Sequence, residues 1–316
     1  MSTKVFQNPL LNPGPDPWIY HHTDGMYYLM VTKRNKLVLQ RNTALSKVAQ
    51  GEEKTIWLPS ETDYFKANFW APELHYIENK WYVYFTANDG GGDDTRRVLV
   101  IENSNEDPYV GDWELKGVIN TERPGLDGSV FYHKEQLYFL YAGYGHFPDY
   151  GSAIYIAAME NPWTLKGEEV LLTKPEYDWE KQGGMAINEG PVILKRNGKL
   201  FLVYSASTTW SDDYSLGMLT INEDDDVLDV NAWSKSPKPV FSKNVEQGVY
   251  GPGHNSFTTS PDRTEDWIVY HAFTNGGENN PERSLRIQAF SWNEDGTPNF
   301  GRPIGLANDI PVPSGE

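Results

Sequence analysis

The chain has 316 residues, and its 44 Asp and Glu outnumber its 27 Lys and Arg, giving a formal net charge of −17 at pH 7. This negative charge disfavours nucleic acid and anionic membrane surfaces as partners, and the absence of cysteine excludes disulfides, thiolate metal sites and cysteine nucleophiles. Aromatic residues make up 14% of the chain, which together with frequent Gly and Pro indicates many short strands joined by turns.

Five pairs of apolar runs follow one another along the sequence, and each pair is predicted to form a β-hairpin. The second run of every pair carries large residues on both faces, as expected of a strand covered on both sides. These second runs begin, in chain order, at Tyr27, Trp81, Leu137, Leu200 and Trp267, which lie 54 to 67 residues apart. This spacing suits one four-stranded antiparallel blade per repeat. The sequence therefore predicts an all-β chain, a five-bladed β-propeller that forms a single domain over residues 1–316.

Two further segments carry structural expectations. Closing a ring of blades requires the two ends of the sequence to meet, and the segments 6–11 and 304–310 are the candidates. The glycine-rich acidic segment 89–94 lacks the spacing of a calcium-binding or phosphate-binding loop, so it is predicted to be solvated.

A polar residue stands at the start of the first run in each repeat. These residues are Asp16, Glu73, Asp127, Glu189 and His254. If the first strand of every blade lines a central axis, the five side chains converge. Each carboxylate alone has an ordinary interpretation as a turn or loop residue that caps its own backbone.

Three of these leading residues, Asp16, Asp127 and Glu189, share the same expected place in the repeat, which favours a catalytic interpretation. Hydrolysis of a glycosidic bond with inversion needs a base that activates water and an acid that protonates the leaving oxygen, roughly 6.5 to 9.5 Å apart. A third carboxylate beside the acid keeps the acid protonated by like-charge repulsion.

Six short segments resemble, in order and at fitting intervals, the motifs of glycoside hydrolase family 43. They are Gly14–Pro17, Trp70–Leu74, Leu126–Ser129, Asn188–Pro191, Tyr204–Ser207 and Gly251–Asn255, and together they cover nearly the whole chain. The resemblance implies a five-bladed propeller that cleaves arabinose- or xylose-containing glycans with inversion and requires no cofactor. It also implies that Asp16 is the general base, that Glu189 is the general acid, and that Asp127 raises the pKa of the acid and orients it.

The same resemblance suggests two supporting residues. His254 matches a histidine near the propeller axis that contacts a bound calcium, mostly through water, or a water network. A buried imidazole held by hydrogen bonds is the alternative, because one neutral imidazole is a poor calcium site without oxygen donors. Arg286 falls where an arginine of the family contacts the sugar and the base, and an exposed strand arginine is its alternative.

Four more residues are predicted to contact the sugar. Trp70 could stack on a sugar face, although tryptophan in a propeller often packs between blades. Trp210 and Tyr214, together with Asp213, are expected to form a pocket wall, and Glu73 is expected to bind the substrate.

The stretch from Tyr204–Ser207 to Leu216–Leu219 is closest to the exo-acting α-L-arabinofuranosidases of the family. The sequence therefore predicts an enzyme that releases terminal α-L-arabinofuranose from arabino-oligosaccharides. An endo-arabinanase and a β-xylosidase are alternatives within the family, and a sugar-binding propeller without turnover is an alternative of a different class.

The sequence also bears on the cellular compartment and the oligomeric state of the protein. The first fifteen residues contain no apolar core of an export signal, and no stretch approaches the roughly 18 apolar residues of a membrane span. A cytoplasmic protein that does not contact membranes is expected on this basis. The aromatic-rich composition is compatible with a homo-oligomer.

Overall fold

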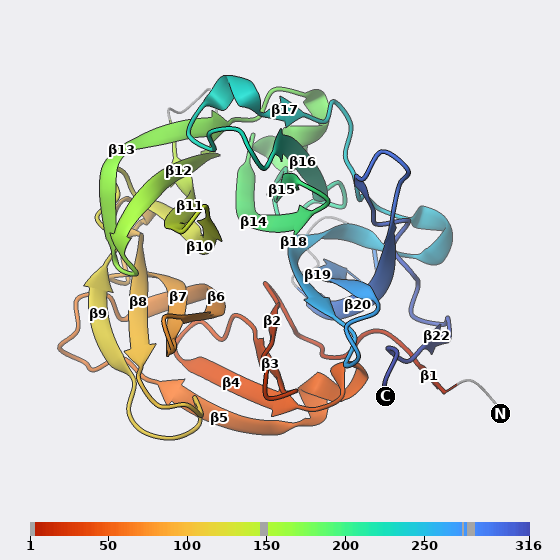
Figure 1. The fold of residues 1–316 in the computed structure, drawn as a ribbon, viewed down its shortest axis with the longest axis horizontal. Helices are drawn as coiled ribbons and strands as arrows, with labels where there is room; N and C mark the ends of the chain where they lie inside the picture. Colours follow the sequence, from red (N-terminus) through yellow and green to blue (C-terminus); the bar gives the residue numbers. More distant parts are fainter. Residues whose placement is uncertain (1–3, 146–150, 274, 277–281) are drawn as a thin grey trace.

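Five four-stranded antiparallel sheets surround a central axis in the computed structural model, which describes residues 4–145, 151–273, 275–276 and 282–316. Figure 1 looks down this axis, with strands β2, β6, β10, β14 and β18 innermost. The predicted five-bladed β-propeller is therefore confirmed.

Every blade is a meander whose strands follow the chain order from the axis outwards. Blade 1 contains β2 (Trp18–His21), β3 (Tyr27–Met30), β4 (Leu37–Asn42) and β5 (Glu52–Trp57), and blade 2 contains β6 (Ala67–Ile77), β7 (Lys80–Asn88), β8 (Arg97–Asn103) and β9 (Glu114–Val118). Blade 3 contains β10 (Gly125–His133), β11 (Gln136–Tyr144), β12 (Ser152–Asn161) and β13 (Thr164–Thr173). Blade 4 contains β14 (Asn188–Arg196), β15 (Lys199–Ala206), β16 (Ser215–Asn222) and β17 (Ser234–Lys235), and blade 5 contains β18 (Tyr250–Thr259), β19 (Asp266–Phe273), β20 (Arg283–Trp292) and β21 (Pro298–Asn299).

Helical structure in the described part of the chain is limited to short 3₁₀ turns between strands. They are η1 (Leu45–Gln50), η2 (Asp93–Thr95), η3 (Asp178–Glu180), η4 (Gln182–Gly184), η5 (Val230–Ala232) and η6 (Val245–Gln247). None of the helices in these residues has the length and apolar character that crossing a membrane requires.

The turns between the first and second strands of the blades explain why these hairpins form. Three of them place two consecutive residues at positive φ, namely Glu78–Asn79, Lys134–Glu135 and Asn197–Gly198. Two left-handed residues in a row match the right-handed twist of the flanking strands, and asparagine and glycine adopt this conformation most readily.

The hydrophobic core lies between neighbouring blades. One cluster, for example, joins Tyr28 and Leu39 of blade 1 to Leu74 and Trp81 of blade 2, and further clusters fill the other junctions. This arrangement accounts for the large residues on both faces of the second strands, because both faces of these strands are covered.

The ends of the sequence meet beside blade 5. Strand β1 (Val5–Phe6) pairs with β22 (Ile310–Pro311), so that Phe6 lies opposite Ile310, and Leu11 bridges to Leu285 of β20. The two segments expected to close the ring thus do meet. The main-chain N–H of Gly14 also donates to the carbonyl of Arg283 at 2.8 Å, which fixes the chain just before Asp16 against the start of β20.

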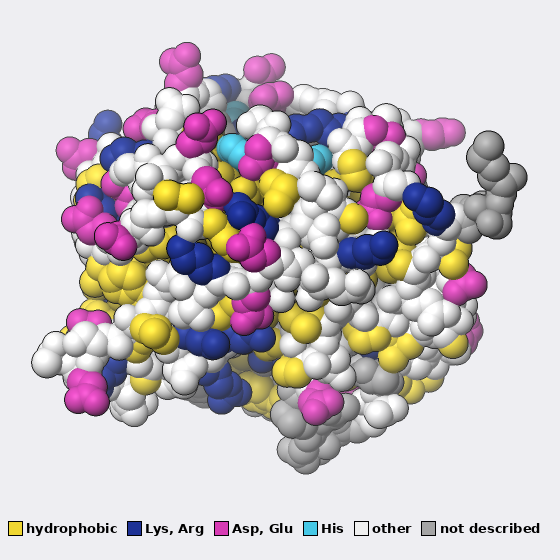
Figure 2. Space-filling model, turned by 90° about the horizontal axis from the view of Figure 1, so that it is seen from below, with side chains coloured by type: hydrophobic (Ala, Val, Ile, Leu, Met, Phe, Trp, Pro, Cys, Tyr) yellow, Lys and Arg dark blue, Asp and Glu magenta, His cyan; other side chains and the backbone are white. Residues whose placement is uncertain are grey.

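The acidic side chains on the face shown in Figure 2 are scattered among basic and neutral residues rather than gathered in one patch. On this face the net charge of −17 does not form a continuous anionic patch.

Candidate active site

The innermost strands all begin at the same end of the central channel, and each has a residue at positive φ within its first five residues or, in β2, just before its start. These residues are Asp16 (54°), Ala71 (44°), Asp127 (55°), Gly190 (56°) and His254 (51°). The pairing register of β6, β10, β14 and β18 shifts beside these residues, as in a β-bulge that redirects a side chain. A left-handed non-glycine residue costs roughly 1–2 kcal/mol, and such strain is typically kept at functional sites.

This repeated position corrects the expectation that the carboxylates are equivalent. Asp16 and Asp127 occupy it, as does His254. Glu189 precedes its counterpart Gly190 by one residue, and Glu73 follows its counterpart Ala71 by two. The bulge nevertheless directs Glu189 towards Asp127, whereas Glu73 lies deeper along its strand.

Asp16 is buried, with 7% of its surface exposed, and its carboxylate is held by two donors. Arg283 Nη1 donates to Oδ1 and Thr32 Oγ1 donates to Oδ2, both at 2.7 Å. Although burial alone would raise it, the pKa of Asp16 is held well below its usual range by the Arg283 guanidinium, helped by the bond from Thr32. Asp16 is therefore ionised at neutral pH, as a general base must be.

Two imidazoles flank the same carboxylate. The main-chain N–H of Asp16 donates to His271 Nδ1 at 3.1 Å, so the neutral ring of His271 carries its proton on Nε2. His254 Nδ1 lies 3.6 Å from Asp16 Oδ1. Burial lowers the pKa of both histidines, with the nearby Arg283 adding to the effect, so both rings are neutral at pH 7.

Asp127 and Glu189 form a second acidic pair. One carboxylate oxygen of each and one ring nitrogen of His254 lie within 4.8 Å of one another. Burial and the charge of Glu189 raise the pKa of Asp127 well above its usual range. Burial, reinforced by Asp16, likewise raises the pKa of Glu189 to about 7. Two carboxyls this close cannot both ionise easily, so the pair retains a proton near neutral pH.

Each member of this pair accepts a hydrogen bond from the protein. Asp127 Oδ2 accepts the main-chain N–H of Gly190 at 3.0 Å, which favours its ionised form. Glu189 Oε1 accepts the hydroxyl of Tyr214 at 2.7 Å, and burial also raises the pKa of this tyrosine, so the hydroxyl remains a donor. Each carboxyl therefore accepts one hydrogen bond that favours its ionised form, while burial raises the pKa of both.

The segment 207–214 connects the two carboxylate groups. Arg283 Nη1, which holds Asp16, also donates to Thr209 Oγ1 at 3.2 Å, and Tyr214 at the other end of the segment holds Glu189. Between them Trp210 is 51% exposed. The structure thus brings Tyr214 to the acid and leaves the Trp210 ring open to solvent on the same segment.

Arg286 does not hold the base, which corrects the sequence-based expectation. It is fully buried within blade 5, where Nε donates to Ser284 Oγ and Nη2 donates to the carbonyl of Phe273. The contact with Asp16 comes from Arg283. Strand β20 begins at the carboxylate end of the channel with Arg283, so Arg283 reaches the site, whereas Arg286 lies three residues further along the strand and does not. The direction of the strand alone could have predicted this difference.

Glu73 is buried, and its partners are protein side chains, although its charge also contributes to raising the pKa of Asp127. Its Oε2 lies 2.9 Å from His75 Nε2, and burial raises its pKa well above its usual range despite a bond from Ser129. These partners suit a structural role in the channel.

Trp70 is half-buried, and one face of its ring is covered by the guanidinium of Arg96, whose Cζ lies 3.5 Å from the ring centroid. Asp93 holds Arg96 in turn, accepting from Nη2 at 2.5 Å. The glycine-rich loop is also ordered by Asp89, whose Oδ1 accepts from the N–H of Gly91 and the hydroxyl of Thr95. The prediction of a merely solvated loop was therefore incomplete, since its last turn supports Trp70.

The residues around His254 do not fit a calcium ion. Asp127, Glu189 and His254 together offer two carboxylate oxygens and one nitrogen, whereas calcium takes six to eight oxygen ligands. An ion there would also compete with the proton that the acidic pair retains. These residues therefore do not form a calcium site.

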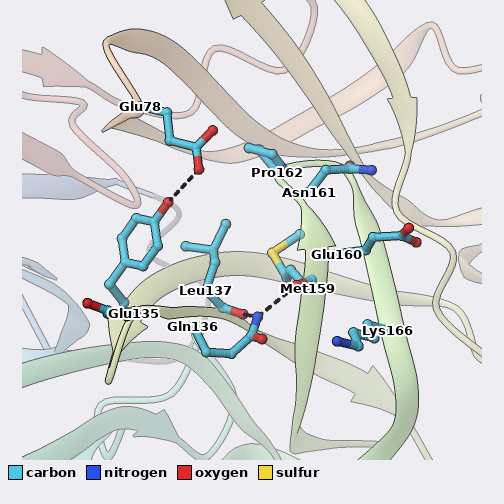
Figure 3. A pocket seen from close by; sticks show the side chains of 10 residues that line it. Glu78, Glu135, Gln136, Leu137, Met159, Glu160, Asn161, Pro162 and Lys166 are labelled. Carbon is cyan, nitrogen blue, oxygen red and sulfur yellow. Dashed lines mark hydrogen bonds between the residues drawn. The ribbon is translucent and has the colours of Figure 1, made fainter.

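A cavity of about 470 Å³ has a lining that includes none of these carboxylates, and Figure 3 shows the side chains that line it. Glu78, Glu135 and Asn161 line it, and they belong to hairpin turns at the opposite end of the blades. This cavity is therefore separate from the end where the innermost strands begin and the carboxylates lie.

An ionised buried carboxylate facing a protonated carboxyl pair, at the end of a five-bladed β-propeller, is the arrangement of an acid–base glycoside hydrolase. The model of glycosyl hydrolases family 43 matches residues 6–298, and the chain belongs to this family.

Named relatives are similar over most of the chain. The "Extracellular exo-alpha-(1->5)-L-arabinofuranosidase" of Streptomyces avermitilis is 40% identical over 95% of this chain, which spans 64% of that protein's length. A protein of the same name from Streptomyces chartreusis is 43% identical over 84% of this chain and 82% of its own. The crystal structure of an α-L-arabinofuranosidase from Lactobacillus brevis has 42% identity and a TM-score of 0.90, with 96% of this chain and 98% of that chain covered.

The prediction of a cytoplasmic protein is wrong on these comparisons, because both Streptomyces relatives are named extracellular. It depended on the missing apolar segment among the first residues, and such an absence does not determine the compartment of a protein.

Proposed function

We propose that this protein is an exo-acting α-L-arabinofuranosidase that removes terminal arabinofuranose from arabino-oligosaccharides with inversion at the anomeric carbon. The named relatives support the substrate. The observation that carries the mechanism is the contrast between Asp16, whose pKa is held low by Arg283, and Glu189, whose pKa is raised to about 7 beside Asp127. One residue is thereby ready to accept a proton and the other to donate one.

The reaction is a single displacement. Asp16 takes a proton from a water molecule while the water oxygen forms a bond to the anomeric carbon. The bond from this carbon to the leaving oxygen breaks, and Glu189 gives its proton to that oxygen. Asp127 keeps the acid protonated, and both carboxyls return to their starting states by exchange with solvent.

The remaining site residues orient the sugar. Arg283 and His254 lie against Asp16 and are placed to contact the hydroxyls of the ring bound there. Trp70 offers its uncovered face to the sugar, and Trp210 and Tyr214 form the wall beside the acid. This assignment replaces Arg286 with Arg283 and leaves Glu73 a structural role.

No cofactor is needed for this chemistry, since the protein supplies both proton-transfer groups. We further propose that the five blades form one catalytic domain. Self-association stays a prediction.

Proton NMR of a digested linear α-1,5-arabino-oligosaccharide tests the function. Free arabinose that first appears as the β-anomer is expected. First products of two or more sugars in place of free arabinose would indicate an endo-arabinanase. First release of the α-anomer would contradict inversion, and absence of any product would favour a sugar-binding propeller.

Glu189→Ala tests the acid. Its loss should reduce the rate far more for oligosaccharides, whose leaving groups need protonation, than for activated aryl arabinofuranosides. Equal losses on both substrates would contradict the assignment. Glu176→Ala, at an exposed position of the connection before β14, is the control.

A further inference from the structure

A second cavity, of about 350 Å³, lies beside blade 4. Its lining includes Trp179, Gln182, Asp213, Ser215, Pro239 and Lys243. We propose that this cleft binds the part of an arabino-oligosaccharide that leaves when the bond is cut. The inference rests on the proposed function and adds to it a preference for chains longer than two sugars.

The cleft opens at the same end of the propeller as the carboxylates. Trp179 and Gln182 belong to η3 and η4, which lead into the start of β14, and Asp213 precedes the start of β16. Strands β14 and β16 run in the same direction, because both are antiparallel to β15. The lining residues therefore gather where these strands begin, which is where Glu189 lies.

The cleft is also within reach of the acid. Glu189 of β14 pairs with Ser205 of β15, which pairs with Leu216 of β16. Two strand spacings separate Glu189 from Leu216, or about 10 Å, and Ser215, one residue before Leu216, lines the cleft. A short oligosaccharide spans this distance.

The segment 207–214 connects the acid to the cleft directly. Tyr214 donates to Glu189, and the preceding Asp213 accepts from Lys243 Nζ at 2.6 Å inside the cleft. The main-chain N–H of Thr208 donates to the carbonyl of Gln182. Because Glu189 protonates the leaving oxygen, the leaving chain begins beside Tyr214 and can continue along this segment, past the exposed ring of Trp210, into the cleft.

The chemistry of the cleft suits a neutral sugar chain. The half-buried Trp179 ring lies nearly parallel to Tyr177, at 12°, and its Nε1 donates to the carbonyl of Pro237, so the ring is fixed. Flat aromatic rings bind the apolar faces of sugars, and a few amide and charged groups orient the hydroxyls. One lysine and one aspartate pair with each other here, so the lining gives no excess charge that would select an anionic ligand.

The test compares kcat/KM on arabinotetraose with kcat/KM on an aryl α-L-arabinofuranoside, which has no second sugar. In the unmodified protein, kcat/KM for the oligosaccharide should rise with each added sugar up to the tetraose. In Trp179→Phe the ratio of the two values should fall by roughly two- to tenfold, because the aromatic contact with the sugar is weakened. In Lys243→Ala the ratio should also fall, because the ammonium group no longer orients the sugar hydroxyls. Lys238→Ala, an exposed lysine on the same connection outside the cleft, should leave the ratio unchanged.

The outcomes separate this proposal from the proposed function. If the protein cleaves the aryl arabinofuranoside but its kcat/KM does not rise with chain length, the proposed function stands and the proposal that the cleft binds the leaving chain is wrong. An unchanged ratio in both variants overturns it as well. If Trp179→Phe lowers the melting temperature, the ratio measured for Lys243→Ala decides alone. Failure to cleave either substrate contradicts the proposed function itself.

Discussion

Tyr214→Phe should move the alkaline limit of activity upwards, because it removes the hydroxyl that stabilises the ionised form of Glu189. The bond is 2.7 Å long, and both side chains are at most 9% exposed. A hydrogen bond to a charged group contributes about 1.5–3 kcal/mol, and one pKa unit corresponds to about 1.36 kcal/mol. Part of the bond is kept when Glu189 is protonated, so we expect a net rise of roughly one unit, taking the pKa of Glu189 from about 7 to roughly 8.

The sign of the effect follows from the role of the residue. The acid acts in its protonated form, so the rate falls as pH rises through the pKa of Glu189. A higher pKa keeps the acid protonated to a higher pH and shifts this fall upwards. The assay is kcat/KM against pH on arabinotriose, whose leaving oxygen needs protonation.

The control is Tyr82→Phe, which removes a buried tyrosine–glutamate bond in blade 2, where Tyr82 donates to Glu102 at 2.6 Å. It should leave the alkaline limit in place. A limit in Tyr214→Phe that stays at the unmodified value, or that moves to lower pH, would refute the assignment of Glu189 as the acid regulated by Tyr214.

Three further results are expected. Arg283→Met should raise the pKa of Asp16, so that the base is protonated at a higher pH and the acidic limit of kcat/KM moves up; loss of a charge-assisted bond of about 1.5–3 kcal/mol should lower kcat/KM at neutral pH by roughly ten- to a hundredfold. Arg96→Met should remove the cation from the Trp70 ring, a contact of about 0.5–2 kcal/mol, and raise KM by several-fold with little change in kcat. Dialysis against a chelator should change neither kcat nor the melting temperature, because the residues around His254 do not form a calcium site.

Each of these results has a contrary outcome. If Arg286→Met, and not Arg283→Met, moved the acidic limit, the base would be held by the buried arginine after all. Asp94→Asn, an exposed neighbour of the aspartate that holds Arg96, should leave KM unchanged, and an equal rise in both variants would indicate general disturbance of the loop. A loss of activity on dialysis that calcium restores would contradict the donor-set argument.

The sequence was sufficient for the fold and for the three carboxylates because both depend on repetition. Large residues on both faces of Trp81–Phe85 or Leu200–Tyr204 have one simple explanation, a strand between two neighbouring blades. Converging first strands then place Asp16, Asp127 and Glu189 near the axis without any knowledge of side-chain geometry.

The supporting residues depend on features that repetition does not encode. Glu189 precedes the positive-φ residue of its strand, Gly190, whereas Glu73 follows the positive-φ residue of its strand, Ala71. A bulge of one residue therefore determines whether a side chain points into the site. Arg283 and Arg286 are three residues apart on one strand, so the choice between them requires the direction and end point of β20. His271 and Thr32 belong to second strands or their ends, where the search for leading residues did not extend.

The junction between blades 1 and 5 is the seam of the ring, and the base straddles it. Each of these two blades takes all four strands from its own part of the chain, so across the seam the main chain is held by the segment before blade 1, through the Leu11–Leu285 bridge and the bond from Gly14 to Arg283. Asp16 lies on one side, while Arg283 and His271 lie on the other. Heating that breaks these few contacts should therefore separate the base from its counter-ion while the five blades are still intact, and activity should disappear before the circular dichroism of the strands does.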